Sequence, residues 1–181
     1  MKELSGFKAD YYRMTGECFQ FKPRMLLFWL GMHNLRYVYW WRRAAAGSWL
    51  GRLQTLRYAK KYGIEGGKTA KIGKGLYLGH AYGITISGEA VLGDNVNIHK
   101  GATIGRTSRS ETAGAPTIGS QVWIGVNATV VGKITVGNDV LIAPGAYVNF
   151  DVPDHSIVIG NPGTIHSAEY ATRDYVNFLV K

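Results

Sequence analysis

The sequence contains little cysteine and few acidic residues. One cysteine, Cys18, stands among 181 residues, so an internal disulfide is excluded, and the chain is not a disulfide-stapled scaffold. No basic start followed by an apolar stretch and a small-residue cleavage site is visible at Met1, so we expect a cytoplasmic protein. The length suits one domain with a small accessory segment.

Long apolar runs are also missing. The longest stretch of residues 22–47 that is free of Lys and Arg, 25–35, is about half of the ~20 residues that a bilayer span requires. Acidic residues number 12 against 21 Lys and Arg, which gives a net charge of +9. All of this excess lies in residues 1–62, which also hold four of the five tryptophans. The chain is therefore not expected to cross a membrane.

Residues 1–62 read as a basic, aromatic helical segment. Pro23 opens a run that is predicted to be helical, and a second helix is predicted over 48–61. Two interpretations stay open: the aromatic residues pack on the rest of the protein, or the segment contacts the inner face of a membrane, where rings and cations suit anionic lipid. A nucleic-acid surface is not favoured, because no binding motif accompanies the charge.

What the chain does have is a six-residue repeat between Ile72 and Pro153. An aliphatic anchor returns every six positions, and a second, small or aliphatic residue follows four places later. The anchors are Ile72, Leu78, Ile84, Ile86, Leu92, Ile98, Ile104, Ile118, Ile124, Val130, Val136, Ile142 and Val148. A period of six fits neither a helix nor a half-buried strand, but it fits short strands joined by tight turns. We therefore predict a β-solenoid over 63–165, followed by a helical tail over 166–181.

Two irregularities interrupt this repeat. The anchors slip by two residues between Ile84 and Ile86, just after His80, and a loop over 106–117 separates Ile104 from Ile118. Insertions in a solenoid line one face and commonly build its site. We expect the chemistry close to them.

The stretch from Lys71 to Pro162 resembles the left-handed β-helix of the hexapeptide acyltransferases, and most of all their serine acetyltransferase branch. The opening ADYYRMTG of residues 9–16 is similar to the start of capsule and O-antigen acetyltransferases. This resemblance implies a mainly β fold, a homotrimer and acetyl-CoA as the acetyl donor, with no metal. A zinc site shared by His80 and His99 is disfavoured, because the slip between them disturbs the stacking of ligands.

The same resemblance implies roles for individual residues. His80 falls on the position of the catalytic histidine, which would act as general base, and Glu65 on that of the aspartate that orients it. The acetyl-CoA site is expected at Gly105, Gly125, Lys133, Ala143, Gly160, Asn161 and Pro162. The acceptor site is expected at Tyr82, His99, Arg106 and Arg109, with Tyr77 as a further stacking residue.

The chain departs from the serine acetyltransferases at two charged positions. Gly79 stands where that branch has an aspartate, and residues 114–116 read Gly-Ala-Pro in place of Arg-His-Pro. A site for an amino acid needs a cation and an anion, so we expect the acceptor to be a sugar hydroxyl of a bacterial surface-polysaccharide precursor, free or lipid-linked. Two alternatives stay open: serine O-acetylation in cysteine synthesis, or a catalytically silent trimeric scaffold.

Overall fold

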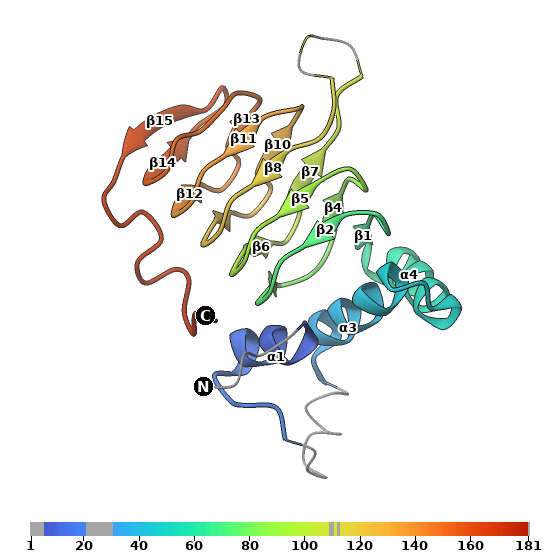
Figure 1. The fold of residues 1–181 in the computed structure, drawn as a ribbon. Helices are drawn as coiled ribbons and strands as arrows, with labels where there is room; N and C mark the ends of the chain where they lie inside the picture. The colour runs from blue at the N-terminus through green and yellow to red at the C-terminus, as the bar shows by residue number, and fades with distance from the viewer. Residues whose placement is uncertain (1–5, 21–30, 109–110, 112, 181) are drawn as a thin grey trace.

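The computed structural model describes residues 6–20, 31–108, 111 and 113–180. Its strands form three sheets, parallel except for the last strand, wound into a β-solenoid of about five turns, with helices packed at the end where the first strands begin (Figure 1). The three sheets hold five, four and six strands, and each of the first four coils contributes one strand to each sheet. The predicted solenoid is confirmed.

The strands are short, as a six-residue period requires. The first sheet contains β1 (Glu65–Gly66), β4 (Thr85–Ile86), β7 (Thr103–Gly105), β10 (Thr129–Val131) and β13 (Tyr147–Val148). The second contains β2 (Lys71–Ile72), β5 (Val91–Leu92), β8 (Thr117–Ile118) and β11 (Thr135–Val136). The third, here called sheet C, contains β3 (Tyr77–Gly79), β6 (Asn97–His99), β9 (Trp123–Ile124), β12 (Val140–Ile142), β14 (Ser156–Ile159) and β15 (Thr164–Ser167).

The predicted anchors form the core. Every anchor from Leu78 to Val148 is at most 3% exposed, and Ile72 is partly buried. In-register pairing stacks equivalent anchors on successive coils, as Ile98 on Ile124 shows. Burying this aliphatic column stabilises the fold by roughly 25 cal/mol per Å² of apolar surface removed from water. The slip is also real: Ile84 and Ile86 are both buried, and Ile86 is the one that pairs with Ile104.

Three helices precede the solenoid in the described residues: α1 (Phe7–Thr15), α3 (His33–Ala45) and α4 (Trp49–Tyr62). The helix predicted over 48–61 is α4, which Ser48 caps by accepting a hydrogen bond from the Gly51 N–H. The expected helical start at Pro23 lies outside the described residues, and α1 was not predicted, because its apolar residues are too few to show a clear period. Tyr37, Val38 and Trp41 of α3 are fully buried against the solenoid, so packing accounts for the aromatic residues of that helix.

The expected C-terminal helix over 166–181 is wrong. Residues 166–167 end β15, which pairs antiparallel with β14, and residues 168–180 follow as turns and extended chain. This tail lies along sheet C and is held by side chains of the solenoid, including Asn95, whose amide exchanges two hydrogen bonds with the backbone of Val180. Contacts with distant residues replace the local hydrogen bonds of a helix here.

Candidate functional site

The candidate site lies along one edge of sheet C, where its parallel strands end. His80 follows β3, His99 ends β6, Gly125 follows β9, Ala143 follows β12 and Gly160 follows β14. Parallel strands end at the same edge, and neighbouring strands lie ~4.8 Å apart, so this row extends for roughly 19 Å. In strict register the row reads Gly79, His99, Gly125, Ala143 and Ile159, so histidines occupy one end, two small residues follow, and the half-exposed Ile159 closes the row.

His80 has a backbone conformation that its sequence position explains. It adopts φ 47°, in the left-handed region, whereas Lys100, the next residue after β6, is not among the residues with positive φ. The two extra residues of the slip follow His80 directly, so the chain turns sharply there and leaves the imidazole exposed. Exposure at a distorted turn gives His80 access to a substrate.

His99 lies beside His80, on the neighbouring strand. It pairs with Gly79, and its ring fills the space above that glycine. Burial lowers the pKa of His99, and the nearby charge of His80 lowers it further, so the ring is held neutral. Its Nε2 atom is buried and has no hydrogen-bond partner within the described chain. An unpaired polar atom of this kind is a site for a ligand hydroxyl or a water.

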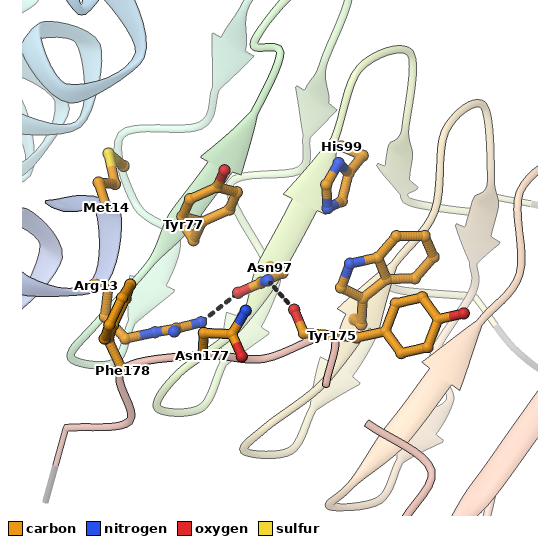
Figure 2. Close-up of a pocket in the computed structure, with 9 residues that line it drawn as sticks. Arg13, Met14, Tyr77, Asn97, His99, Tyr175, Asn177 and Phe178 are labelled. Carbon is orange, nitrogen blue, oxygen red and sulfur yellow. Dashed lines mark hydrogen bonds between the residues drawn. The ribbon is translucent and has the colours of Figure 1, made fainter. Parts of the chain in front are cut away.

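A pocket of about 210 Å³ adjoins His99 on the outer face of sheet C. Figure 2 shows His99 and Tyr77 on one side of it and the C-terminal tail on the other. Most of the side chains that line it are aromatic or amide. The full lining consists of Arg13, Met14, Tyr77, Asn97, His99, Trp123, Tyr175, Asn177 and Phe178. The His99 and Trp123 rings lie 4.7 Å apart, and those of Trp123 and Tyr175 5.2 Å apart. This lining offers flat apolar surfaces with a few hydrogen-bonding groups between them.

Arg13, the one Lys or Arg among the pocket's described lining residues, already donates hydrogen bonds to other residues. Its Nε donates to the Gly75 carbonyl at 3.1 Å, and its Nη2 donates to Oδ1 of Asn97. Burial lowers the pKa of Arg13 to about 10, which still leaves it charged near neutrality. Asn97 in turn donates from Nδ2 to the Tyr175 carbonyl at 3.1 Å. Helix α1, sheet C and the tail thus meet at this point (Figure 2).

Sequence reasoning missed a second group of residues beside His80. His33, at the start of α3, lies with Nε2 3.0 Å from the Ala81 carbonyl and stacks on Tyr62 at 4.6 Å. Its ring centroid is also 4.8 Å from that of Tyr82, which is exposed. Asn34 donates to the Leu78 carbonyl at 2.9 Å. These contacts fasten the coil that carries His80, and no motif around His33 could have shown them.

Glu65 lies on β1 and pairs with Thr85, just beyond the two-residue slip. It is exposed, and no hydrogen bond joins it to His80 in the described part of the chain. The Tyr37 hydroxyl accepts a hydrogen bond from the next residue, Gly66, and burial raises the pKa of that tyrosine above its ordinary value. The predicted role of Glu65 in orienting His80 stays a prediction.

The residues expected to bind acetyl-CoA fall into two places. Gly125, Ala143 and the turn Gly160-Asn161-Pro162 lie on the edge of sheet C, whereas Gly105 and Lys133 lie at the end of the first sheet. A side chain at Gly125 would press on the next coil, since its Cβ would lie 2.6 Å from the Pro144 nitrogen. Packing of the backbone therefore keeps position 125 without a side chain.

Two arginines were expected at the acceptor. Arg106 is exposed and lies 3.4 Å from a carboxylate oxygen of Glu89. It starts the loop over 106–117, whose base is closed by hydrogen bonds of 3.0 Å between Thr107 and Gly114. Arg109 lies outside the described residues. Among the residues that are described, no cluster of three or more His, Cys, Asp or Glu side chains is arranged to hold a metal ion.

Comparisons with known proteins match this architecture. Residues 115–149 match the family model "Bacterial transferase hexapeptide (six repeats)". The chain is 38% identical over 109 residues to Serine acetyltransferase 4 of Arabidopsis thaliana, covering 60% of this chain and 31% of that protein. It is 40% identical over 99 residues to a serine acetyltransferase of Helicobacter pylori, covering 55% and 58%.

The fold is similar to that of a solved serine acetyltransferase. The Neisseria gonorrhoeae enzyme superposes with a TM-score of 0.73 at 28% identity, covering 91% of this chain and 64% of that one. A structure of that enzyme in complex with serine gives the same TM-score. The chain spans about a third to three fifths of the length of the curated relatives named here. It has the hexapeptide-repeat solenoid of the bacterial transferases, and its sequence and fold are similar to those of the serine acetyltransferases.

Proposed function

We propose that the protein is an acetyl-CoA-dependent O-acetyltransferase with His80 as its general base. The observation that carries this proposal is the position of His80, exposed at a distorted turn where the parallel strands of sheet C end. An alcohol is a poor nucleophile until its proton is being removed, and a neutral imidazole is suited to remove it near neutral pH.

In the proposed reaction, His80 accepts the proton of the acceptor hydroxyl while that oxygen attacks the thioester carbonyl. The carbon–sulfur bond then breaks, and the imidazolium returns the proton to the departing sulfur, so the ester and free CoA are the products. Acetyl-CoA would lie along Gly125 and Ala143 toward Asn161. A carboxylate at Glu65 would steady the imidazolium if it reaches His80 when substrate is bound.

L-serine is the acceptor that the relatives favour, since each protein named above is a serine acetyltransferase. Such a site holds a carboxylate and an ammonium group, and a specific site should supply a charge for each. In this chain Gly79 and the Gly114-Ala115-Pro116 segment provide neither. Among the described residues that line the adjoining pocket, Arg13 is the only charged side chain, and it donates to Asn97.

A neutral sugar hydroxyl is the second candidate, and the pocket beside His99 favours it. Sugar rings present apolar C–H faces and many hydroxyls, which suit aromatic walls with amide and imidazole groups between them. The pocket offers Tyr77, Trp123 and Tyr175 as flat surfaces and His99 Nε2 as an unpaired polar atom. A polysaccharide precursor would be one source of such a ring. A trimer, which the resemblance implies, forms part of the proposal and is checked by the mass in solution.

The deciding experiment measures CoA release from acetyl-CoA by thiol detection, with L-serine and with a panel of sugars and nucleotide-sugars. Wild-type protein is compared with His80→Ala and with His166→Ala, which removes an exposed histidine of β15 that has no role in the proposed reaction. We expect release with one acceptor class, a loss of roughly 10²–10⁴-fold in His80→Ala, and none in His166→Ala. A chain that neither binds CoA nor releases it would be a silent scaffold.

A further inference from the structure

Helix α4 has an apolar outer side that the described parts of the chain leave uncovered. Its inner side packs on α3, where Gly51 comes so close that a Cβ there would lie 2.6 Å from the Ala44 nitrogen. On the outer side, Trp49 is 74% exposed and Leu56 62%, while Leu50 and Leu53 are 37% and 38% exposed. Large apolar side chains gathered in this way commonly mark a surface that binds something.

Cations flank this apolar stripe on both sides. With 3.6 residues per turn, Leu56, Trp49 and Leu53 fall within about 60° of one another around the helix axis, and the exposed Lys60 continues this stripe at the C-terminal end of the helix. Arg52 lies on one side of the stripe, and Arg57 and Lys61 lie on the other, all three exposed. Long basic side chains at the borders of an apolar stripe can reach upward to negatively charged groups while the stripe is buried.

Helix α4 itself carries no negative charge, since the sequence has no Asp or Glu between Glu17 and Glu65. Glu65 lies on β1, which contacts α4. In the described part of the chain, no carboxylate forms an ion pair with a cation of α4. A second copy of this chain docked face to face would bring the same cations against one another. Charge complementarity therefore favours an anionic partner over a second copy.

We propose that this face of α4 docks on an anionic lipid surface. An interfacial helix combines an apolar stripe that carries tryptophan with cations that meet anionic headgroups, and α4 has both. Figure 1 shows α4 at the end of the solenoid where β1 lies, away from β14 and β15. Docking there leaves the edge of sheet C accessible. None of the helices that the structure describes has the length and apolarity to cross a bilayer, so the contact is peripheral.

The test is cosedimentation of the full chain with vesicles of phosphatidylcholine containing 30% phosphatidylglycerol, at low and high salt. We expect binding at low salt, and binding weaker by about tenfold or more to pure phosphatidylcholine or in Leu53→Ser/Leu56→Ser. Arg52→Gln/Arg57→Gln should weaken binding to the anionic vesicles and reduce its dependence on salt. Circular dichroism confirms that each variant is folded.

Matched controls come from the far end of the solenoid. Ile165→Ser removes an aliphatic side chain that is as exposed as Leu53, and Arg173→Gln removes an exposed cation. Neither should change vesicle binding. The proposal is wrong if wild-type protein does not sediment with anionic vesicles, or if the controls reduce binding as much as the α4 variants. It is also wrong if Leu53→Ser/Leu56→Ser lowers the mass of the assembly in sedimentation velocity, since the face would then be a subunit contact. None of these readouts depends on acetyl transfer.

Discussion

The His99 ring fills the space that a side chain at Gly79 would need: a Cβ placed on Gly79 would lie 2.4 Å from Nδ1 of His99. They pair across β3 and β6, and the ring of His99 takes the volume that a side chain at residue 79 would need. The absence of the expected aspartate at position 79 is thus tied to the presence of His99. A single substitution cannot restore the charge without moving the ring.

The first prediction concerns this pair. Gly79→Ala should lower the free energy of unfolding by about 1–3 kcal/mol, because the methyl group overlaps the imidazole. His99→Ala removes the obstacle, so Gly79→Ala should cost much less in that background. Urea denaturation of wild type, both single variants and the double variant gives the coupling energy. Additive losses would show that the two residues do not share this space.

The same pair of residues also leads to a prediction about the KM for serine. If serine is the acceptor that the relatives favour, Gly79→Asp/His99→Ala should accept it better than wild type, because an anion for its ammonium group is restored. The KM for serine measures this, and Gly79→Asn/His99→Ala is the matched uncharged control. Equal KM values in the two double variants would contradict the role of charge at position 79.

The repeat allowed the solenoid and its core to be predicted, because both depend on residues close together in the sequence, whereas His80 was singled out by the resemblance and its role stays a prediction. Ile84 and Ile86 even revealed the slip that sets the backbone of His80. The pocket could not be predicted, since its walls come from α1, sheet C and the tail, and only the fold brings Arg13, Asn97 and Tyr175 together. His33 was missed for the same reason. The tail was wrongly predicted as a helix because its anchors are side chains of distant coils.

The second prediction concerns the buried ion pair that joins α1 to α3. Asp10 is fully buried, accepts from Arg42 Nη2 at 2.8 Å and from the Leu76 N–H at 2.9 Å, and so fastens both helices to the first coil. Burial raises the pKa of Asp10, and these hydrogen bonds act against that rise. Asp10→Ala should lower the free energy of unfolding by about 3–5 kcal/mol, since it leaves the charge of Arg42 without a carboxylate, with only the Ile72 and Gly73 carbonyls as acceptors.

Glu89→Ala provides the comparison for Asp10→Ala. Its partner Arg106 is 3.4 Å away and both side chains are about half exposed, so solvent screens the pair. Its loss should change stability by less than about 1 kcal/mol. Both variants are measured by urea denaturation under the same conditions. Equal losses would show that the Asp10 pair contributes no more than a surface pair.

The third prediction is a pH dependence due to His99. Its pKa in the folded protein lies below 6.5, so at acidic pH the unfolded chain binds a proton there that the folded chain does not. Stability should therefore fall as pH drops below about 6.5. His155 has the opposite sign, because its hydrogen bond to Asp139 raises its pKa. Comparing wild type with His99→Asn at each pH cancels the contribution of His155.

In that comparison, the unfolding free energy of wild type should decline more steeply between pH 7 and pH 5 than that of His99→Asn. A His99→Asn variant with the wild-type slope would show that the ring is protonated equally in the folded and unfolded chains. His80→Ala should raise the pKa of His99 slightly, because the electrostatic effect of His80, which lowers that pKa, is removed. The decline in stability toward acidic pH should then be less steep.

The last prediction concerns Asp139, which holds the start of the C-terminal tail. Its carboxylate accepts from the Ala171 and Thr172 N–H groups at 3.1 and 2.9 Å and from the Thr172 hydroxyl at 2.6 Å. Asp139→Ala should lower the free energy of unfolding by about 1–3 kcal/mol and expose Arg173 to trypsin. Asp151→Ala is the control, since Asp151 accepts from a backbone N–H at 2.7 Å inside the solenoid, away from the tail.

The pH dependence of this effect has a definite sign. Burial acts to raise the pKa of Asp139, but the hydrogen bonds from Thr172 and His155 outweigh it, and the net pKa lies below 3.8. The stabilisation is therefore present above pH 3.8 and is lost as the pH falls through the lower, folded-state value. The unfolding free energies of wild type and Asp139→Ala should become equal at that pH.

Because Tyr175, Asn177 and Phe178 of the tail form a wall of the pocket, Asp139→Ala should also raise the KM for an acceptor bound there, whereas Asp151→Ala should not. Tryptic cleavage at Arg173 that is equally slow in all three proteins would show that Asp139 does not anchor the tail.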